Sequence, residues 1–253
     1  MRRAAICRIT CSTNDCKMEK KTDGLVLRSN DYRENDKLLT VLTAKYGKLT
    51  VAARGVKKAG AKLRFAAQPF CFAEFVLAER GGRHTLVSAS CHESFFALRT
   101  EAIYPASAVL EIADAVASEG AVCTDFFLHT VEALRNMTAG DVKEALAAYL
   151  LCALDECGIP VDTGRCFLCG RELTAPKTYF YFPTGSFSCA ACAKGVGAAY
   201  ETYLLLRRLR FGGAGESEEE TKRRALSLLK EYLSYKTVIG SRCLKEYLRQ
   251  LSR

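Results

Sequence analysis

Residues 24–53 read GLVLRSNDYRENDKLLTVLTAKYGKLTVAA, and the pattern in this stretch decides the fold of the N-terminal part of the chain. Five short runs rich in Leu, Val, Thr and Phe lie in this stretch or follow it: residues 24–27, 38–43, 49–53, 70–77 and 85–89. Tyr46-Gly47 and Gly81-Gly82 separate two pairs of runs, at places where hairpin turns require positive φ. Five short strands with such turns predict a small barrel, and their number fits an OB-type barrel.

The period of the apolar residues changes to about 3.6 after residue 100, which indicates helices. Two stripes show this spacing: Ile103, Ala106, Leu110, Ala113 and Ala117, and then Leu128, Val131 and Leu134. Asp141 followed by Glu144 resembles a capping box and predicts the start of a third helix. Ser217 with Glu220 predicts another helix start by the same argument, and a last helix is expected over residues 241–251.

Two C-x2-C pairs carry the strongest chemical signal in the sequence. Their cysteines are Cys166, Cys169, Cys189 and Cys192, and 19 residues separate the pairs. Each pair forms a knuckle that aims two thiolates at one point, and two knuckles complete a tetrahedral site suited to Zn²⁺. Because sulfur fills all four positions, one structural zinc ion is predicted. The alternative is four incidental cysteines, since the chain has 13 in all.

These patterns predict an α+β protein. An OB-type barrel is expected at residues 18–98, and a helical domain with a zinc-binding insertion at 164–195 is expected at residues 99–253. Residues 1–17 show no periodicity and are expected to be a leader or disordered arm. Cysteines that are grouped in this way indicate a reducing cytoplasm. The apolar stretch 145–154 is far shorter than the roughly 18 to 20 residues of a membrane helix.

Positive charge is concentrated in the first part of the chain. The whole chain has a formal net charge of +9. Residues 1–17 contribute +3, residues 18–98 contribute +6, and residues 99–253 are neutral. Residues 37–73 hold eight cations and no acid, which indicates a polyanionic partner. Tyr32 and Tyr46 lie in polar loops and are candidates for stacking on bases, whereas Phe70 and Phe72 are assigned to the barrel interior.

Catalytic motifs are missing from the sequence. It has no phosphate-binding G-x-x-x-x-G-K-S/T loop, no G-x-G-x-x-G and no H-E-x-x-H. The three histidines lack the spacing of metal ligands. Cys91 and His92 are neighbours in a predicted strand region and would point to opposite faces, so they are a poor catalytic pair. We therefore expect no enzyme and no small-molecule substrate.

Several segments, in this order, resemble the RecO family of bacterial recombination mediators. They are TDGLVLR at 22–28, DYRENDKLLT at 31–40, YGK at 46–48 and ARGVKK at 53–58. The four cysteines after Gly158-Ile159-Pro160 are similar to those of the zinc-bearing members, and residues 244–251 resemble the family's last helix. Family sequences begin near Met18, so Met18 is expected to be the functional start.

The resemblance implies a mediator without enzymatic turnover that binds single- and double-stranded DNA. Such proteins anneal complementary strands coated by the single-strand-binding protein SSB, help RecA loading with RecR, and dock the SSB C-terminal tail on their helical domain. They act in the cytoplasm at the nucleoid. DNA contacts carried over from the family are Arg28, Arg33, Lys37, Arg54, Lys57 and Lys58, and charge alone adds Lys48 and Lys62.

A second hypothesis is a zinc-containing OB-fold protein that binds RNA or acts in translation. Composition does not separate the two hypotheses, because OB folds with basic loops bind both nucleic acids. The ordered resemblance favours the recombination mediator.

Overall fold

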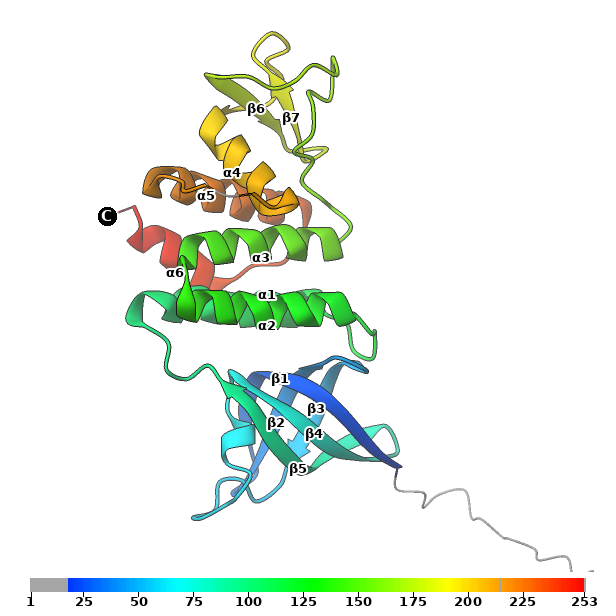
Figure 1. The fold of residues 1–253 in the computed structure, drawn as a ribbon. Helices are drawn as coiled ribbons and strands as arrows, with labels where there is room; N and C mark the ends of the chain where they lie inside the picture. Colours follow the sequence, from blue (N-terminus) through cyan, green and yellow to red (C-terminus); the bar gives the residue numbers. More distant parts are fainter. Residues whose placement is uncertain (1–17, 214, 253) are drawn as a thin grey trace, which may run out of the picture.

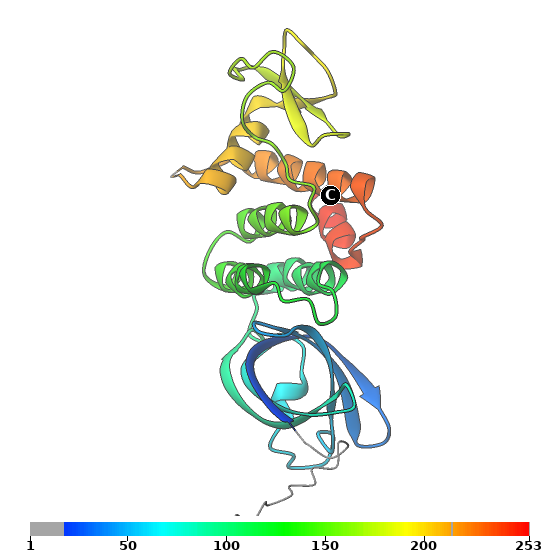
Figure 2. The ribbon, with the colours of Figure 1, turned by 90° about the vertical axis from the view of Figure 1, so that its right-hand side faces the viewer.

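The computed structural model describes residues 18–213 and 215–252, and its N-terminal part is a closed five-stranded barrel (Figures 1 and 2). The strands are β1 (Met18–Tyr32), β2 (Asp36–Thr43), β3 (Gly47–Ala53), β4 (Cys71–Arg80) and β5 (Arg83–Ser94). Their order around the barrel is β1-β2-β3-β5-β4, and β3 runs parallel to β5. The predicted OB-type barrel is confirmed. The expected leader at 1–17 lies outside the described residues, and the boundary between residues 98 and 99 stays a prediction.

The barrel core comes from the alternation of side chains along each strand. In β4, Cys71, Ala73 and Phe75 point inward and are fully buried. Phe72 therefore points outward, where its ring centroid lies 6.1 Å from that of Phe127 in the helical part. The assignment of Phe70 and Phe72 to the barrel interior was wrong, because both rings pack against the helical core.

Six helices of the described residues form layers on one end of the barrel (Figure 1). They are α1 (Ile103–Val116), α2 (Thr124–Ala139), α3 (Val142–Glu156), α4 (Tyr200–Phe211), α5 (Glu219–Lys236) and α6 (Arg242–Gln250). α1 and α2 lie nearest the barrel, and α4 lies farthest from it. None of the helices in the described part of the chain combines the length and apolarity that crossing a bilayer requires.

Two of the three predicted helix starts, those of α3 and α6 but not that of α5, have a side-chain cap. The Asp141 side chain accepts hydrogen bonds from the backbone N–H groups of Lys143 (2.8 Å) and Glu144 (3.0 Å), so the predicted start of α3 is confirmed. Ser241 caps α6 in the same way. Ser217 does not cap α5, which begins at Glu219. Its hydroxyl instead accepts a hydrogen bond from Arg208 at 3.2 Å, a partner that lies on α4.

A small three-stranded sheet lies at the end of the molecule opposite the barrel (Figure 1). Its strands are β6 (Lys177–Tyr181), β7 (Ser186–Cys189) and β8 (Val196–Ala199), in the order β7-β6-β8. β6 and β7 form an antiparallel hairpin, and β8 and α4 were not predicted. Phe180 of β6 meets Tyr232 of α5 edge to face with ring centroids 5.3 Å apart, which attaches the sheet to the helices.

The β2–β3 turn docks on the loop between α1 and α2. The N–H of Gly120 donates to the Lys48 carbonyl at 3.2 Å, and the Thr124 hydroxyl donates to the Ala44 carbonyl at 3.0 Å. Gly47 has φ +65°, and a Cβ atom there would lie 2.0 Å from the Ala121 carbonyl oxygen. Only glycine meets both conditions, so this turn is built for contact with the helical part.

Candidate metal centre and nucleic-acid interface

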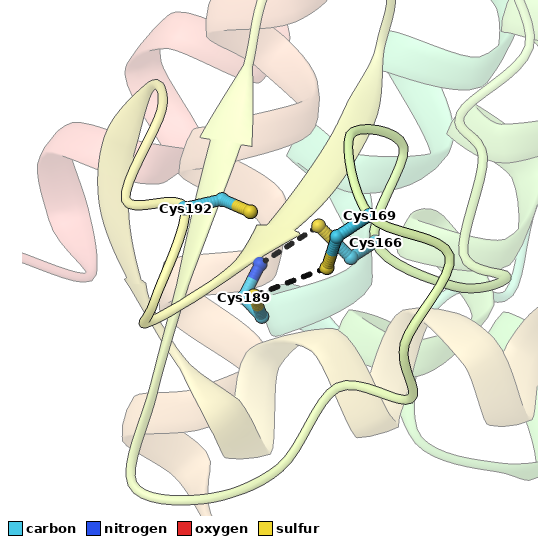
Figure 3. A group of neighbouring side chains, drawn as sticks. All are labelled: Cys166, Cys169, Cys189 and Cys192. Atoms are coloured by element: carbon cyan, nitrogen blue, oxygen red, sulfur yellow. Dashed lines mark hydrogen bonds between the residues drawn. The ribbon is translucent and has the colours of Figure 1, made fainter.

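The four predicted cysteines converge on one point (Figure 3). Cys166 and Cys169 lie in the loop that follows α3, and Cys189 ends β7 with Cys192 in the next turn. Their sulfur atoms all lie within 4.8 Å of one another, and Cys169 Sγ is 3.7 Å from Cys189 Sγ. A tetrahedral ion with metal–sulfur bonds of about 2.3 Å requires sulfur atoms about 3.8 Å apart. The cysteines therefore fit one metal ion.

Backbone N–H groups favour thiolates at this centre. Burial opposes ionisation of Cys166, but the N–H groups of Cys189, Cys169 and Leu168 outweigh it and lower the pKa of this thiol to about 6. The Cys189 N–H lies 3.4 Å from Cys166 Sγ. The N–H of Cys192 likewise lowers the pKa of Cys189. Hydrogen bonds with the neighbouring thiols of Cys169 and Cys189 instead raise the pKa of Cys192. The backbone therefore favours the thiolate, which is the metal-binding form, at Cys166 and Cys189.

A second feature is the end of the barrel farther from the helices, where the β1–β2 turn meets the loop 54–70. The N–H of Lys57 donates to the Asn35 carbonyl at 3.1 Å, and the N–H of Gly55 donates to the Asp36 carboxylate at 2.8 Å. These bonds gather seven of the ten predicted nucleic-acid residues. We call this group the basic end of the barrel: Tyr32, Arg33, Lys37, Arg54, Lys57, Lys58 and Lys62.

The cations of the basic end differ in their availability. Within the described residues, the exposed side chains of Arg54, Lys58 and Lys62 have no ion-pair partner. Lys57 donates to Asp31 at 2.8 Å, and this hydrogen bond holds the pKa of the Asp31 carboxyl below its ordinary value. The Arg33 guanidinium lies 5.2 Å from the ring centroid of Tyr32, whose side chain is 45% exposed. Arg64 lies in the same loop and is also exposed, although it was not among the predicted DNA contacts.

Three predicted residues lie elsewhere. Lys48 Nζ is 3.2 Å from the Asp114 carboxylate of α1, and only 17% of its side chain is exposed. In this structure Lys48 therefore joins the barrel to the helices, and its selection as a DNA contact stays a prediction. Arg28 pairs with the same carboxylate but stays more than half exposed. Tyr46 is half-buried in the docked β2–β3 turn, where Lys20 Nζ lies 4.8 Å from its ring centroid.

Comparison with known proteins decides the family. The family model described as "Recombination protein O N terminal" matches residues 18–95, and "Recombination protein O C terminal" matches residues 99–241. The chain belongs to the RecO family. A DNA repair protein RecO from Desulforamulus reducens is 33% identical over 176 residues, which cover 68% of each chain. Its counterpart from Anaeromyxobacter sp. is 32% identical over 209 residues, which cover 79% of this chain and 82% of that protein.

A third relative shows how far the likeness extends. DNA repair protein RecO from Desulfitobacterium hafniense is 30% identical over 172 residues, which cover 67% of this chain but 63% of that protein. Membership in the RecO family makes this chain a DNA repair protein.

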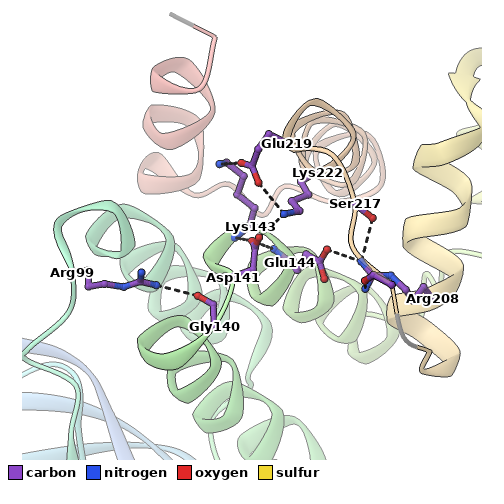
Figure 4. A network of polar contacts seen from close by, with 10 residues as sticks. Arg99, Gly140, Asp141, Lys143, Glu144, Arg208, Ser217, Glu219 and Lys222 are labelled. Atoms are coloured by element: carbon purple, nitrogen blue, oxygen red, sulfur yellow. Dashed lines mark hydrogen bonds and ion pairs between the residues drawn. The ribbon is translucent and has the colours of Figure 1, made fainter.

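Other basic groups of this RecO protein are neutralised within the helical part (Figure 4). Lys222 is buried, contacts Asp141, and lies 2.8 Å from Glu219. Desolvation opposes its charge, but hydrogen bonds to these two carboxylates raise the pKa of Lys222 above its ordinary value. The neighbouring cations Arg208, Arg210, Arg223 and Arg224 pair with Glu144, Asp155 and Glu220. These groups do not extend the basic end of the barrel.

Proposed function

We propose that this chain is a non-enzymatic recombination mediator that anneals complementary DNA strands coated by SSB and helps RecA loading together with RecR. The observation that carries the proposal is the cluster of unpaired cations at the basic end of the barrel, beside the exposed Tyr32. Phosphates would contact Arg54, Lys58 and Lys62, and a base would stack on Tyr32. Phosphate contacts do not read bases, which suits a protein that must act on any sequence.

We propose DNA contacts for seven of the eight cations that the sequence analysis selected. They are Arg28, Arg33, Lys37, Arg54, Lys57, Lys58 and Lys62. Arg28 and Lys57 would have to leave an acidic partner, so their contributions are expected to be smaller. The family likeness supports RecR and the SSB C-terminal tail as partners, and action in the bacterial cytoplasm at the nucleoid.

We also propose that the cysteine site holds one structural Zn²⁺. Four sulfur ligands leave no open position for water, so the ion would stabilise the small sheet without taking part in a reaction. The strands of the sheet bury two large apolar side chains, Phe180 and Phe187, in the helical core. The ion would hold together the loops around Cys166, Cys169 and Cys192, which such a short segment cannot fix by packing alone. The likeness to zinc-bearing family members and the fit of the sulfur atoms support this assignment.

The proposal is tested by annealing of SSB-coated complementary oligonucleotides, with and without RecR. Wild-type protein is expected to accelerate annealing, and the triple variant R54Q/K58Q/K62Q is expected to be much slower. The variant R223Q/R224Q is a matched control, because Glu220 already neutralises both arginines. The proposed function would be refuted if the wild-type protein annealed no strands and bound SSB-coated DNA no better than the triple variant. Preference for RNA over DNA would favour the translation-associated alternative.

A further inference from the structure

The strand β6 presents two tyrosines and a lysine on its outer face. Thr178 and Phe180 are fully buried, whereas Lys177, Tyr179 and Tyr181 alternate with them and reach solvent. Successive side chains of a strand point to opposite faces, so these three side chains form one row. We call this row the tyrosine face.

Neighbouring elements leave the rings of Tyr179 and Tyr181 half-buried. Gly197 of β8 lies opposite Tyr179 in the sheet register and offers no side chain that would cover the ring. A Cβ atom at Gly197 would lie 2.9 Å from Lys177 Cε, so the lysine stem crosses this glycine. Phe167 extends the row, because its ring stacks on Tyr181 with centroids 5.3 Å apart and planes 11° apart.

Two lysines accompany the rings. Lys177 Nζ lies 5.2 Å from the ring centroid of Tyr179, and Lys194 Nζ lies 4.9 Å from that of Tyr181. In the described parts of the chain, neither ammonium group has an acidic partner within ion-pair distance. The backbone of Lys194 is held in place, since both its N–H and its carbonyl bond to the Ser188 hydroxyl.

The charge of this segment differs from that of the surrounding helical part. Residues 164–195 contain four basic side chains and one acidic side chain, although residues 99–253 together are neutral. The cations are Arg165, Arg171, Lys177 and Lys194, and the acid is Glu172. Four thiolates with one Zn²⁺ would add a charge of −2, so the segment would keep a net charge of about +1. Exposed rings alone would also suit a protein partner. Rings with a surplus of unpaired cations select a partner that has both flat groups and negative charge.

We propose that the tyrosine face binds single-stranded DNA, as a second contact separate from the basic end of the barrel. Bases would stack on Tyr179 and Tyr181, and the flexible lysine ammonium groups would move from the ring faces to phosphates. A mostly apolar hollow of about 550 Å³ adjoins the row. Its lining includes Tyr181, Phe182, Val196 and Tyr235, together with the charged side chains of Lys230 and Glu231. This hollow provides room for a base that leaves the stack.

This inference rests on the proposed function and deepens it. The tyrosine face and the barrel lie at opposite ends of the molecule, with the helices between them (Figures 1 and 2). A chain with a contact at each end holds two strands, or two parts of one strand, at a high effective concentration. Such a bridge is what the joining of complementary strands requires.

The test uses the full chain with its metal and a fluorescent oligo-dT probe followed by anisotropy. The background is R54Q/K58Q/K62Q, in which the residual binding reports contacts outside the basic end of the barrel. Tyr179→Ala is expected to weaken this residual binding by about fivefold or more, which is the effect of losing one stacked base. K177Q/K194Q is expected to lower the slope of log K against log salt by about 1.4, since each single-strand contact contributes about 0.7.

Controls separate this outcome from misfolding and from failure of the proposed function. R242Q/K245Q removes two exposed charges of α6 from the same part of the chain and is expected to change binding little. Cross-linking of the wild type to 5-iodouracil DNA, with mapping of the modified peptide, is expected to identify residues 177–181. If the added substitutions leave the metal content, the residual binding and the salt slope of the R54Q/K58Q/K62Q background unchanged, the tyrosine face is overturned, even if wild-type annealing succeeds. Loss of RecR binding in the same variants, with DNA binding intact, would show a protein-binding face instead.

Discussion

Replacing Arg54, Lys58 and Lys62 with glutamine is expected to lower the salt dependence of single-strand binding. All three side chains are exposed on the loop 54–70 and have no ion-pair partner in the parts of the chain that the structure describes. Each can therefore contact a phosphate without breaking an internal bond. Lys57 is left out of the variant, because its removal would also release the Asp31 carboxylate.

The magnitude follows from counterion release. Each phosphate contact on a single strand contributes about 0.7 to the slope of log K against log salt, so three lost contacts lower it by about 2.1. Between 50 and 200 mM salt, wild-type affinity should then fall about 18-fold more than the affinity of the variant. On duplex DNA the corresponding change in slope is about 2.7, because each contact contributes about 0.9.

The assay is anisotropy of a labelled oligonucleotide, titrated at four or more salt concentrations. Several oligonucleotides of different sequence should be affected alike, since phosphate contacts position the protein without reading bases. The control R223Q/R224Q removes two charges that Glu220 already neutralises and should leave the slope close to that of the wild type. A wild-type slope and affinity in the triple variant, together with lost binding in the control, would place the main DNA surface on the helices and refute the reasoning.

The remaining predictions concern the metal, a helix cap and the barrel contact. Elemental analysis of protein purified without chelators is expected to find one Zn²⁺ per chain. The variant Cys189→Ser is expected to lose the ion and to expose residues 164–195 to protease. Substoichiometric metal in the wild-type protein would contradict the site. Asp141→Ala should lower the free energy of unfolding by about 2 to 3 kcal/mol, because α3 loses its cap and Lys222 loses one of two carboxylates. Burial opposes ionisation of Asp141, but hydrogen bonds from Lys222 and two backbone N–H groups outweigh burial and lower the pKa of this carboxyl. The stabilisation by Asp141 is therefore complete above about pH 4 and is lost as the pH falls through the folded-state pKa. Denaturant titrations that gave the same difference in unfolding free energy between wild type and variant at pH 3 and pH 7 would argue against this account. Gly47→Ala should destabilise the protein more than Gly60→Ala. Both residues have positive φ, but a Cβ atom at Gly60 meets nothing within 4 Å. Equal melting temperatures of the two variants would refute the close contact between Gly47 and Ala121.

Local patterns in the sequence were enough to predict the barrel strands, the start of α3 and the cysteine quartet. Each of these features depends on residues that are close in the chain or on spacing that the backbone imposes. Alternation in a strand and the reach of the Asp141 side chain to Glu144 need no distant partner. Within each C-x2-C knuckle, the short spacing alone orients the two thiolates toward one point. The family likeness has the same origin, because it rests on the order of short segments.

The state of individual charges depended on partners that lie far away in the chain. Lys48 and Lys58 look alike in the basic stretch, yet Lys48 meets Asp114, which is 66 residues later, and Lys58 meets no acid in the described chain. Ser217 was predicted to cap α5, but its hydroxyl accepts a hydrogen bond from Arg208 instead. Arg208 lies on α4, a helix that was not predicted from the sequence. The tyrosine face likewise required the register of β8, which sets Gly197 opposite Tyr179. Contacts of this kind arise only when separate elements pack together, since neither composition nor period records which faces meet.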